Sequence, residues 1–229
     1  MSSPDTFHNL SKAILRLLLF VPLLVLAPSS LTSKTLSNRA EISLMTIAPG
    51  AELYSAFGHT AIWVSDPLSG VNTMYNYGTF DFKPDSLTQF YLNFTQGRLN
   101  YRLDTESYRQ FDYVYHYFKR SYFAQVLDLT QDQKQAVYDF LETNYLPANR
   151  YYLYEFFYDN CATRVRDLFQ EVLGDSLTYV GAQASMGMSF RDLLHQYLGD
   201  RRWPQFGIDL ALGAVVDRDI TPWESMFLP

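Results

Sequence analysis

The sequence predicts an α+β domain, and three observations carry this prediction. Residues 40–80 contain short segments that mix apolar and polar side chains and are divided by turn residues, as β-strands are. From residue 85 onward, apolar side chains recur with the 3.6-residue period of helices. A single cysteine, Cys161, stands where an aromatic run gives way to one of these helices. Strands that come first and helices that follow indicate an α+β fold.

The expected strands are all short: 40–47, 59–64, 73–80, a stretch around Tyr101 and Leu103, and 122–129. Asp66–Gly70 supplies a turn with proline and glycine between the second and third strands, so we expect these two strands to form a hairpin. The hairpin places His59 at its open end, across from residues 77–79.

Five stretches carry an apolar stripe at helical spacing: 85–96, 108–118, 130–141, 161–173 and 190–198. Thr130 and Gln133 form a capping box at the start of the third stretch, and Ser189 can cap the last. Gly174 follows the end of the fourth, as glycine often does at a helix C-terminus. The tail from Trp203 to Pro229 is apolar and rich in turns, and we assign no element to it.

The first thirty residues have the pattern of an export signal. Lys12 and Arg16 precede an apolar stretch, Leu17–Ala27, and small residues follow it. This stretch is too short for a comfortable membrane span, which needs about 20 residues. We therefore expect residues 1–30 to be a signal peptide or N-terminal anchor, and residues 40–229 to form one exported domain.

The composition argues against several classes of function. A formal net charge of −6 without a basic run is not typical of nucleic-acid binders. One cysteine and four scattered histidines do not give the spacing of a zinc site, and no glycine-rich phosphate loop or dinucleotide motif occurs. No serine has a nucleophile-elbow context. We therefore expect no metal and no other cofactor, which leaves the cysteine as the candidate for chemistry.

Cys161 lies in the run Tyr158–Arg164, YDNCATR. Exported proteins usually pair their thiols, and a single thiol has no internal partner. Asn160 or Asp159 can cap the helix that follows, which places the sulfur in the first turn. There, unsatisfied N–H groups and the positive end of the helix dipole stabilise a thiolate. The alternative is a small buried hydrophobe, because free cysteine is often buried.

A nucleophilic thiol needs a base within hydrogen-bond reach, and His59 is the candidate for that base. It starts a strand directly after Gly58, where the backbone can approach closely. His8 lies in the leader, whereas His116 and His195 lie inside expected helices and are more simply explained as structural residues.

The group that orients His59 is expected on the returning strand, where Asn76 and Asp81 are the polar candidates. Simple strand alternation puts Asn76 on the same face as His59, whereas a bulge at Gly78 would bring Asp81 there instead, so both stay open. The oxyanion formed on attack would be met by the backbone N–H of the nucleophile. Asn160 is a further candidate for orienting or oxyanion support.

Three segments hold the candidate residues: Leu53–Val64 (LYSAFGHTAIWV), Tyr75–Phe82 (YNYGTFDF) and Phe156–Asp167 (FFYDNCATRVRD). A fourth segment, Asn149–Tyr151 (NRY), precedes the last of them. In combination they resemble the N-terminal periplasmic domain of Lnb-type lipoprotein N-acyltransferases, from about residue 40 to the end. The order of histidine first and cysteine later is similar to the circularly permuted papain-like fold. That resemblance implies a cysteine on a helix N-terminus, packed against a small antiparallel sheet that carries the histidine.

The resemblance also implies a function. Cys161 would take an acyl chain from a membrane phospholipid as a thioester and pass it to the free amino group of a lipoprotein N-terminus, at the membrane surface of the periplasm or cell envelope. The aromatic run at residues 151–158 would suit an acyl-chain groove, or it forms core. Two alternatives stay open: a cysteine peptidase or amidase that acts on cell-wall peptides, and a catalytically inactive binding module.

Overall fold

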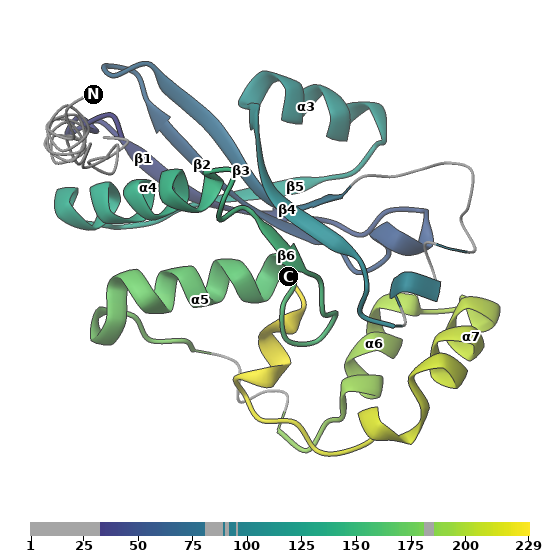
Figure 1. Cartoon of the computed structure of the whole chain (residues 1–229). Coiled ribbons are helices and arrows are strands. Elements are labelled where there is room, and N and C mark those ends of the chain that lie inside the picture. Colours follow the sequence, from purple (N-terminus) through teal and green to yellow (C-terminus); the bar gives the residue numbers. More distant parts are fainter. Residues whose placement is uncertain (1–32, 81–88, 90–91, 95, 181–185) are drawn as a thin grey trace, which may run out of the picture. The chain divides into compact units, whose positions relative to one another are not determined.

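A computed structural model describes residues 33–80, 89, 92–94, 96–180 and 186–229 (Figure 1). The chain divides into two units, residues 1–32 and residues 33–229, and the fold is that of the second unit. The expected signal peptide or anchor and the candidate Asp81 lie outside the described residues. The same holds for much of the helix expected over 85–96, of which residues 89 and 92–94 are helical.

Six strands form one antiparallel sheet in the order β5-β1-β2-β3-β4-β6. Their bounds are β1 Glu41–Ile47, β2 His59–Asp66, β3 Val71–Phe80, β4 Asn100–Ser107, β5 Tyr122–Val126 and β6 Tyr151–Leu153. The predicted hairpin of β2 and β3 is confirmed, with Ile62 paired to Tyr75. The α+β class is confirmed as well, whereas the permuted papain-like arrangement stays a prediction.

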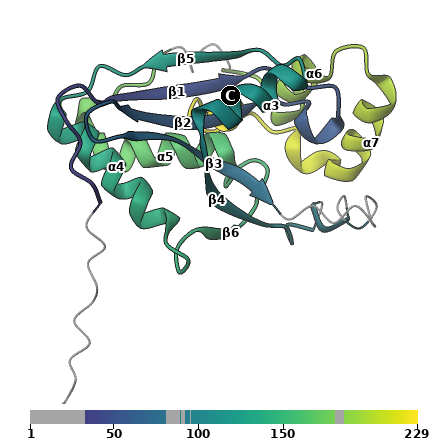
Figure 2. The same ribbon diagram turned by 90° about the horizontal axis from the view of Figure 1, so that it is seen from above.

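Helices cover both faces of the sheet (Figures 1 and 2). The helix α3, Tyr108–Tyr117, packs on one face, and α4, Gln131–Tyr145, and α5, Cys161–Leu173, pack on the other. Alternation along the strands separates the two cores, because successive side chains point to opposite faces. The core beneath α4 and α5 includes Ile42, Ile62, Val64, Leu103, Val165 and Phe169. The core beneath α3 includes Met45, Ile47, Ala61, Met74 and Phe111.

The helix starts follow the predicted caps. The capping box of Thr130 and Gln133 opens α4, which runs four residues beyond its predicted end, to Tyr145. Ser189 caps α6, Phe190–Leu198, by accepting a hydrogen bond from the Asp192 N–H. Local side-chain hydrogen bonds therefore set these boundaries, as the sequence indicated.

The tail contains regular structure that the sequence did not predict. It forms α7, Arg202–Leu212, and two 3-10 segments, Gly213–Val216 and Glu224–Phe227. No residue of α7 is fully buried, although Ile208 and Leu212 pack partly buried against a core cluster, and its sequence contains Pro204 and Gly207, which disfavour helices. A third apolar cluster joins this tail to α6 and to the run before Cys161: Phe157, Phe190, Leu194, Val216, Ile220 and Phe227.

Candidate functional site

Cys161 is the first residue of α5, and Asn160 holds it there. The Asn160 side-chain oxygen accepts hydrogen bonds from the N–H groups of Ala162 (2.7 Å) and Thr163 (2.9 Å). In return, the Asn160 N–H donates to the Thr163 hydroxyl at 2.8 Å, which completes a capping box. Asp159 instead pairs with Arg164 at 2.6 Å, so of the two predicted caps the structure uses Asn160.

The Asn160 amide nitrogen is also engaged. It donates to the carbonyl of Phe156 at 2.6 Å and to that of Phe227 at 2.9 Å, and the side chain is buried. The two amide hydrogens therefore tie the helix start to the run before it and to the C-terminal tail. This places Asn160 as the residue that fixes the position of Cys161, with no amide hydrogen left over to support an oxyanion.

His59, the first residue of β2, lies between Asn76 and Cys161. Its Nε2 atom is 2.8 Å from the Asn76 side-chain oxygen, and its ring forms a hydrogen bond with the Cys161 thiol. Because Asn76 occupies Nε2, Nδ1 is the ring nitrogen left to face the sulfur. The structure thus brings together three of the predicted site residues, Cys161, His59 and Asn76.

Gly78 explains how the imidazole fits against β3. A Cβ atom at this position would lie 2.4 Å from His59 Cε1, closer than side chains tolerate. The Gly78 N–H also donates to the Asn76 side-chain oxygen at 2.8 Å, which fixes the amide that meets the ring. The β3–β4 register shifts between Asn76 and Thr79, so the bulge is present, and Asn76 still faces His59.

Opposite charges stabilise each other within the cysteine–histidine pair. Burial raises the pKa of the Cys161 thiol, but the His59 charge and hydrogen bonds from His59 and from the N–H groups of Thr60 and Ala162 outweigh burial and lower that pKa. Burial lowers the pKa of His59, and the charge and hydrogen bond of Cys161, with the Asn76 bond, outweigh it and raise that pKa. The pair therefore favours a thiolate and an imidazolium.

Two further charged residues act on this pair. Arg120, in the turn after α3, lowers the pKa of His59 through its positive charge. Burial raises the pKa of Glu106 on β4, and the His59 charge opposes that rise. Arg120 is held in place because its Nε and Nη2 atoms donate to the Ala48 carbonyl at 3.0 and 2.8 Å.

The pair opens into a pocket of about 190 Å³ with largely aromatic walls. Among the described residues that line it, Arg120 is the one lysine or arginine. Sequence reasoning missed Arg120, because nothing local distinguishes it from a surface arginine. The aromatic lining residues come from helix α3, from strands and from other segments far apart in the sequence: Tyr54, Phe57, Phe80, Tyr101, Tyr115, Tyr154, Phe156 and Phe227.

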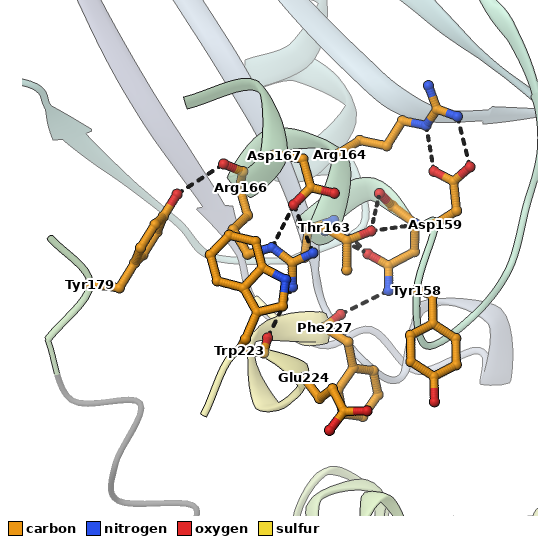
Figure 3. A network of polar contacts seen from close by, with 12 residues as sticks. Tyr158, Asp159, Thr163, Arg164, Arg166, Asp167, Tyr179, Trp223, Glu224 and Phe227 are labelled. Carbon is orange, nitrogen blue, oxygen red and sulfur yellow. Dashed lines mark hydrogen bonds and ion pairs between the residues drawn. The ribbon is translucent and has the colours of Figure 1, made fainter. Parts of the chain in front are cut away.

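The tail completes the pocket wall with Phe227, Leu228 and Pro229. A network of polar contacts holds the preceding turn against α5 (Figure 3). Arg166 donates to the Trp223 carbonyl at 2.9 Å, and its guanidinium lies 3.9 Å from the centre of the indole ring. The tail thus reaches the site through contacts with the helix that carries the cysteine.

The two remaining described histidines lie outside this pocket. His116 pairs with Asp112 at 3.1 Å on exposed α3, and His195 lies 3.0 Å from Asp209 between α6 and α7. Within the described part of the chain, no group of three histidine, cysteine, aspartate or glutamate side chains is arranged to hold a metal ion.

Comparisons with known proteins place the site inside a recognised domain. The family model described as the Lnb N-terminal periplasmic domain matches residues 28–196, a span that contains His59, Asn76 and Cys161. No curated protein and no solved structure matches the sequence. None of the helices in the described residues combines the length and the apolar character that crossing a bilayer requires.

Proposed function

The chain belongs to the Lnb N-terminal periplasmic domain family, and from this premise we propose that it is a cysteine-dependent acyltransferase of the cell envelope. The donor is a membrane phospholipid, and the acceptor is the free amino group of a lipoprotein N-terminus. The observation that carries the proposal is the hydrogen-bonded series Cys161–His59–Asn76 at a helix N-terminus. A nucleophile, a base and a group that orients the base are the parts that acyl transfer through a thiol needs.

In the first half-reaction, the Cys161 thiolate attacks the ester carbonyl carbon of the phospholipid. The carbon–sulfur bond forms, and the developing oxyanion is met by the Cys161 N–H, which as the first helical N–H has no intrahelical acceptor. The carbon–oxygen bond then breaks, and the His59 imidazolium gives its proton to the departing glycerol oxygen. The products are a lysophospholipid and a thioester on Cys161.

In the second half-reaction, the amino group of the acceptor attacks the thioester carbonyl. Neutral His59 takes the proton from the attacking nitrogen, and the thiolate leaves as the amide forms. Asn76 accepts the hydrogen bond from Nε2 throughout, which keeps Nδ1 directed at the sulfur. The cycle ends with the thiolate and imidazolium restored.

The arrangement is also what a permuted papain-like domain would need. The cysteine heads α5, α5 packs on an antiparallel sheet, and the histidine comes from a strand earlier in the chain. We therefore keep that architecture as part of the proposal.

The exposed side of α7 supports a position at the membrane surface. Trp203, Phe206 and Leu210 recur at helical spacing and are 84%, 61% and 74% exposed. A helix with aromatic and aliphatic side chains on one side and arginine at its start is suited to lie in a bilayer interface. Arg201 donates to the carbonyls of Gly50 and Ala51. The start of α7 is thus tied to the loop that leads to the pocket lined by Cys161 and His59, which we call the catalytic pocket.

This membrane contact is tested by sedimentation with phospholipid vesicles. Replacing Trp203, Phe206 and Leu210 together by serine removes the apolar side chains, so we expect the bound fraction to fall several-fold. Leu68→Ser is the control, because Leu68 is equally exposed, at 63%, in the turn between β2 and β3. Equal loss in both variants, or none in the triple variant, would rule out α7 as the contact.

The reaction is tested by the release of lysophospholipid from vesicles in the presence of a diacylated peptide acceptor. We expect the wild type to release lysophospholipid and acylate the amine, and Cys161→Ala to do neither while it keeps the same thermal unfolding midpoint. If the wild type instead releases peptide fragments from cell-wall material and Cys161→Ala does not, the chain is a peptidase or amidase. If neither substrate reacts, it is a binding module.

A further inference from the structure

A second and larger pocket lies beneath α5, against β1 and the segment after β5. Its volume is about 470 Å³, within the range of roughly 300–1,000 Å³ that is usual for small-molecule sites. The catalytic pocket, at about 190 Å³, is smaller than that range. We call the larger pocket the apolar groove, after the side chains that form its interior: Leu44, Leu127, Leu129, Val165, Phe169 and Leu177.

The apolar groove begins beside the nucleophile. Thr60, the residue after His59, and Ala162, the residue after Cys161, both line it. Leu228 and Pro229 line both the apolar groove and the catalytic pocket. The two pockets therefore share a wall next to the sulfur, and each pocket lies on a different side of that wall.

The charged residues that line the apolar groove are not available to bind a charged group in its interior. Of the described lining residues, Asp128 and Arg166 carry charge, and Asp128 is exposed at the rim. Arg166 is already bound to Asp167 at 2.7 Å and stacked on Trp223, as Figure 3 shows. An occupant of the groove is thus recognised by apolar contact rather than by an ion pair.

We propose that the apolar groove binds the hydrocarbon chain of the acyl group that Cys161 carries, with Leu228 and Pro229 as the wall that the chain passes. This inference rests on the proposed acyltransferase function and names a binding site for it. Each methylene buried in the groove strengthens binding about fourfold, so long chains are favoured over short ones. The aromatic run at residues 151–158 does not line the apolar groove. Tyr154 and Phe156 line the catalytic pocket, and Phe157 belongs to the third apolar cluster.

The test uses the Cys161→Ala protein and a fluorescent fatty acid, so that binding is measured without any covalent step. We expect the probe to bind, and as the chain is lengthened from six to sixteen carbons the logarithm of its affinity should rise roughly in proportion to the apolar area buried. Adding Leu177→Trp fills the groove, and we expect binding about tenfold weaker, equivalent to about two lost methylenes. Leu173→Trp, at another lining position, serves as a second variant in case the first does not fold.

Val180→Trp is the matched control. It adds the same ring three residues along the chain, at a position that is 87% exposed and outside the groove lining, so binding should not change. Failure of the probe to bind, unchanged affinity in both tryptophan variants of the groove, or an affinity independent of chain length would each overturn the inference. If the probe binds as expected while the wild type never acylates, the proposed function fails and the groove stands.

Discussion

Two histidines of this domain are each oriented by a side-chain oxygen, and they differ in what lies on the other side of the ring. His195 meets Asp209 at 3.0 Å, and Arg191 binds the same carboxylate at 2.5 Å, in a cluster that joins α6 to α7. His59 meets Asn76 at 2.8 Å and also the Cys161 thiol, at the wall of a pocket.

The difference is that His195 belongs to a cluster that joins two helices, whereas His59 contacts a thiol. The carboxylate of Asp209 is already bound by Arg191, and His195 contacts this carboxylate. The His59 ring has a neutral amide as partner, so the opposite charge that raises its pKa comes from the thiolate. Removing the Cys161 sulfur, the His59 ring or the Asn76 amide should therefore affect the site at His59 and leave the cluster at His195 unchanged.

The largest expected effect is that of His59→Ala on the reactivity of Cys161. Without the imidazolium, burial dominates and the pKa of the thiol rises, so alkylation by iodoacetamide near pH 7 should slow by about 10²-fold. His195→Ala should leave the rate unchanged. Equal rates in the wild type and His59→Ala would contradict the thiolate–imidazolium pair.

The pH dependence follows from the directions of the two pKa shifts. Alkylation of the wild type by iodoacetamide should persist at pH values below the usual titration range of a thiol, because the pKa of Cys161 is lowered. Acid should stop the alkylation by protonating the thiolate. Acyl transfer should fall on the alkaline side only above the usual range of histidine, because the pKa of His59 is raised. In His59→Ala the acid limb of the alkylation profile should move to higher pH.

A comparable effect, this time on kcat, is expected for Gly78→Ala, which places a methyl group against the His59 ring. The added Cβ would lie 2.4 Å from Cε1, so the ring must move, and we expect kcat to fall about 10²-fold with a loss of about 1–3 kcal/mol in the free energy of unfolding. Gly207→Ala is the matched control. No atom lies within 4 Å of a Cβ built there, and alanine in α7 should raise the free energy of unfolding by up to about 1 kcal/mol.

The smallest of these effects is expected for Asn76→Ala, which removes a positioning contact and keeps the ring and the sulfur. We expect kcat to fall about tenfold with little change in KM, and the alkaline limb of the pH profile to move to lower pH because the Asn76 hydrogen bond raises the pKa of His59. Asp209→Ala, which removes the carboxylate beside His195, should change neither value. An unchanged pH profile in Asn76→Ala would mean that the amide does not act on the ring.

Much of this architecture could be read from local sequence signals. Strand alternation around the turn at residues 66–70 gave the hairpin, and the capping residues Thr130, Asn160 and Ser189 mark the starts of three helices. These features depend on residues a few positions apart, which is why a single sequence reveals them.

Other features depend on contacts between distant segments and leave no such pattern. Helix α7 contains Pro204 and Gly207 and buries none of its side chains fully, so its local sequence does not favour a helix. The apolar groove draws on β1, the segment after β5, α5 and the tail, and Arg120 reaches the pocket beside Cys161 from the turn after α3. The choice between Asn76 and Asp81 stayed open in the sequence because it depended on the local geometry at Gly78. In the described residues, Asn76 makes the contact.

The central claim is that Cys161 carries the acyl group, and peptide mass spectrometry after incubation with phospholipid vesicles tests it most directly. The account predicts a mass increase equal to one acyl group on the peptide that contains Cys161, removed by hydroxylamine as a thioester is and absent from Cys161→Ala. An unmodified Cys161 peptide in protein that nevertheless releases lysophospholipid, or an acyl group on another residue, would contradict the account.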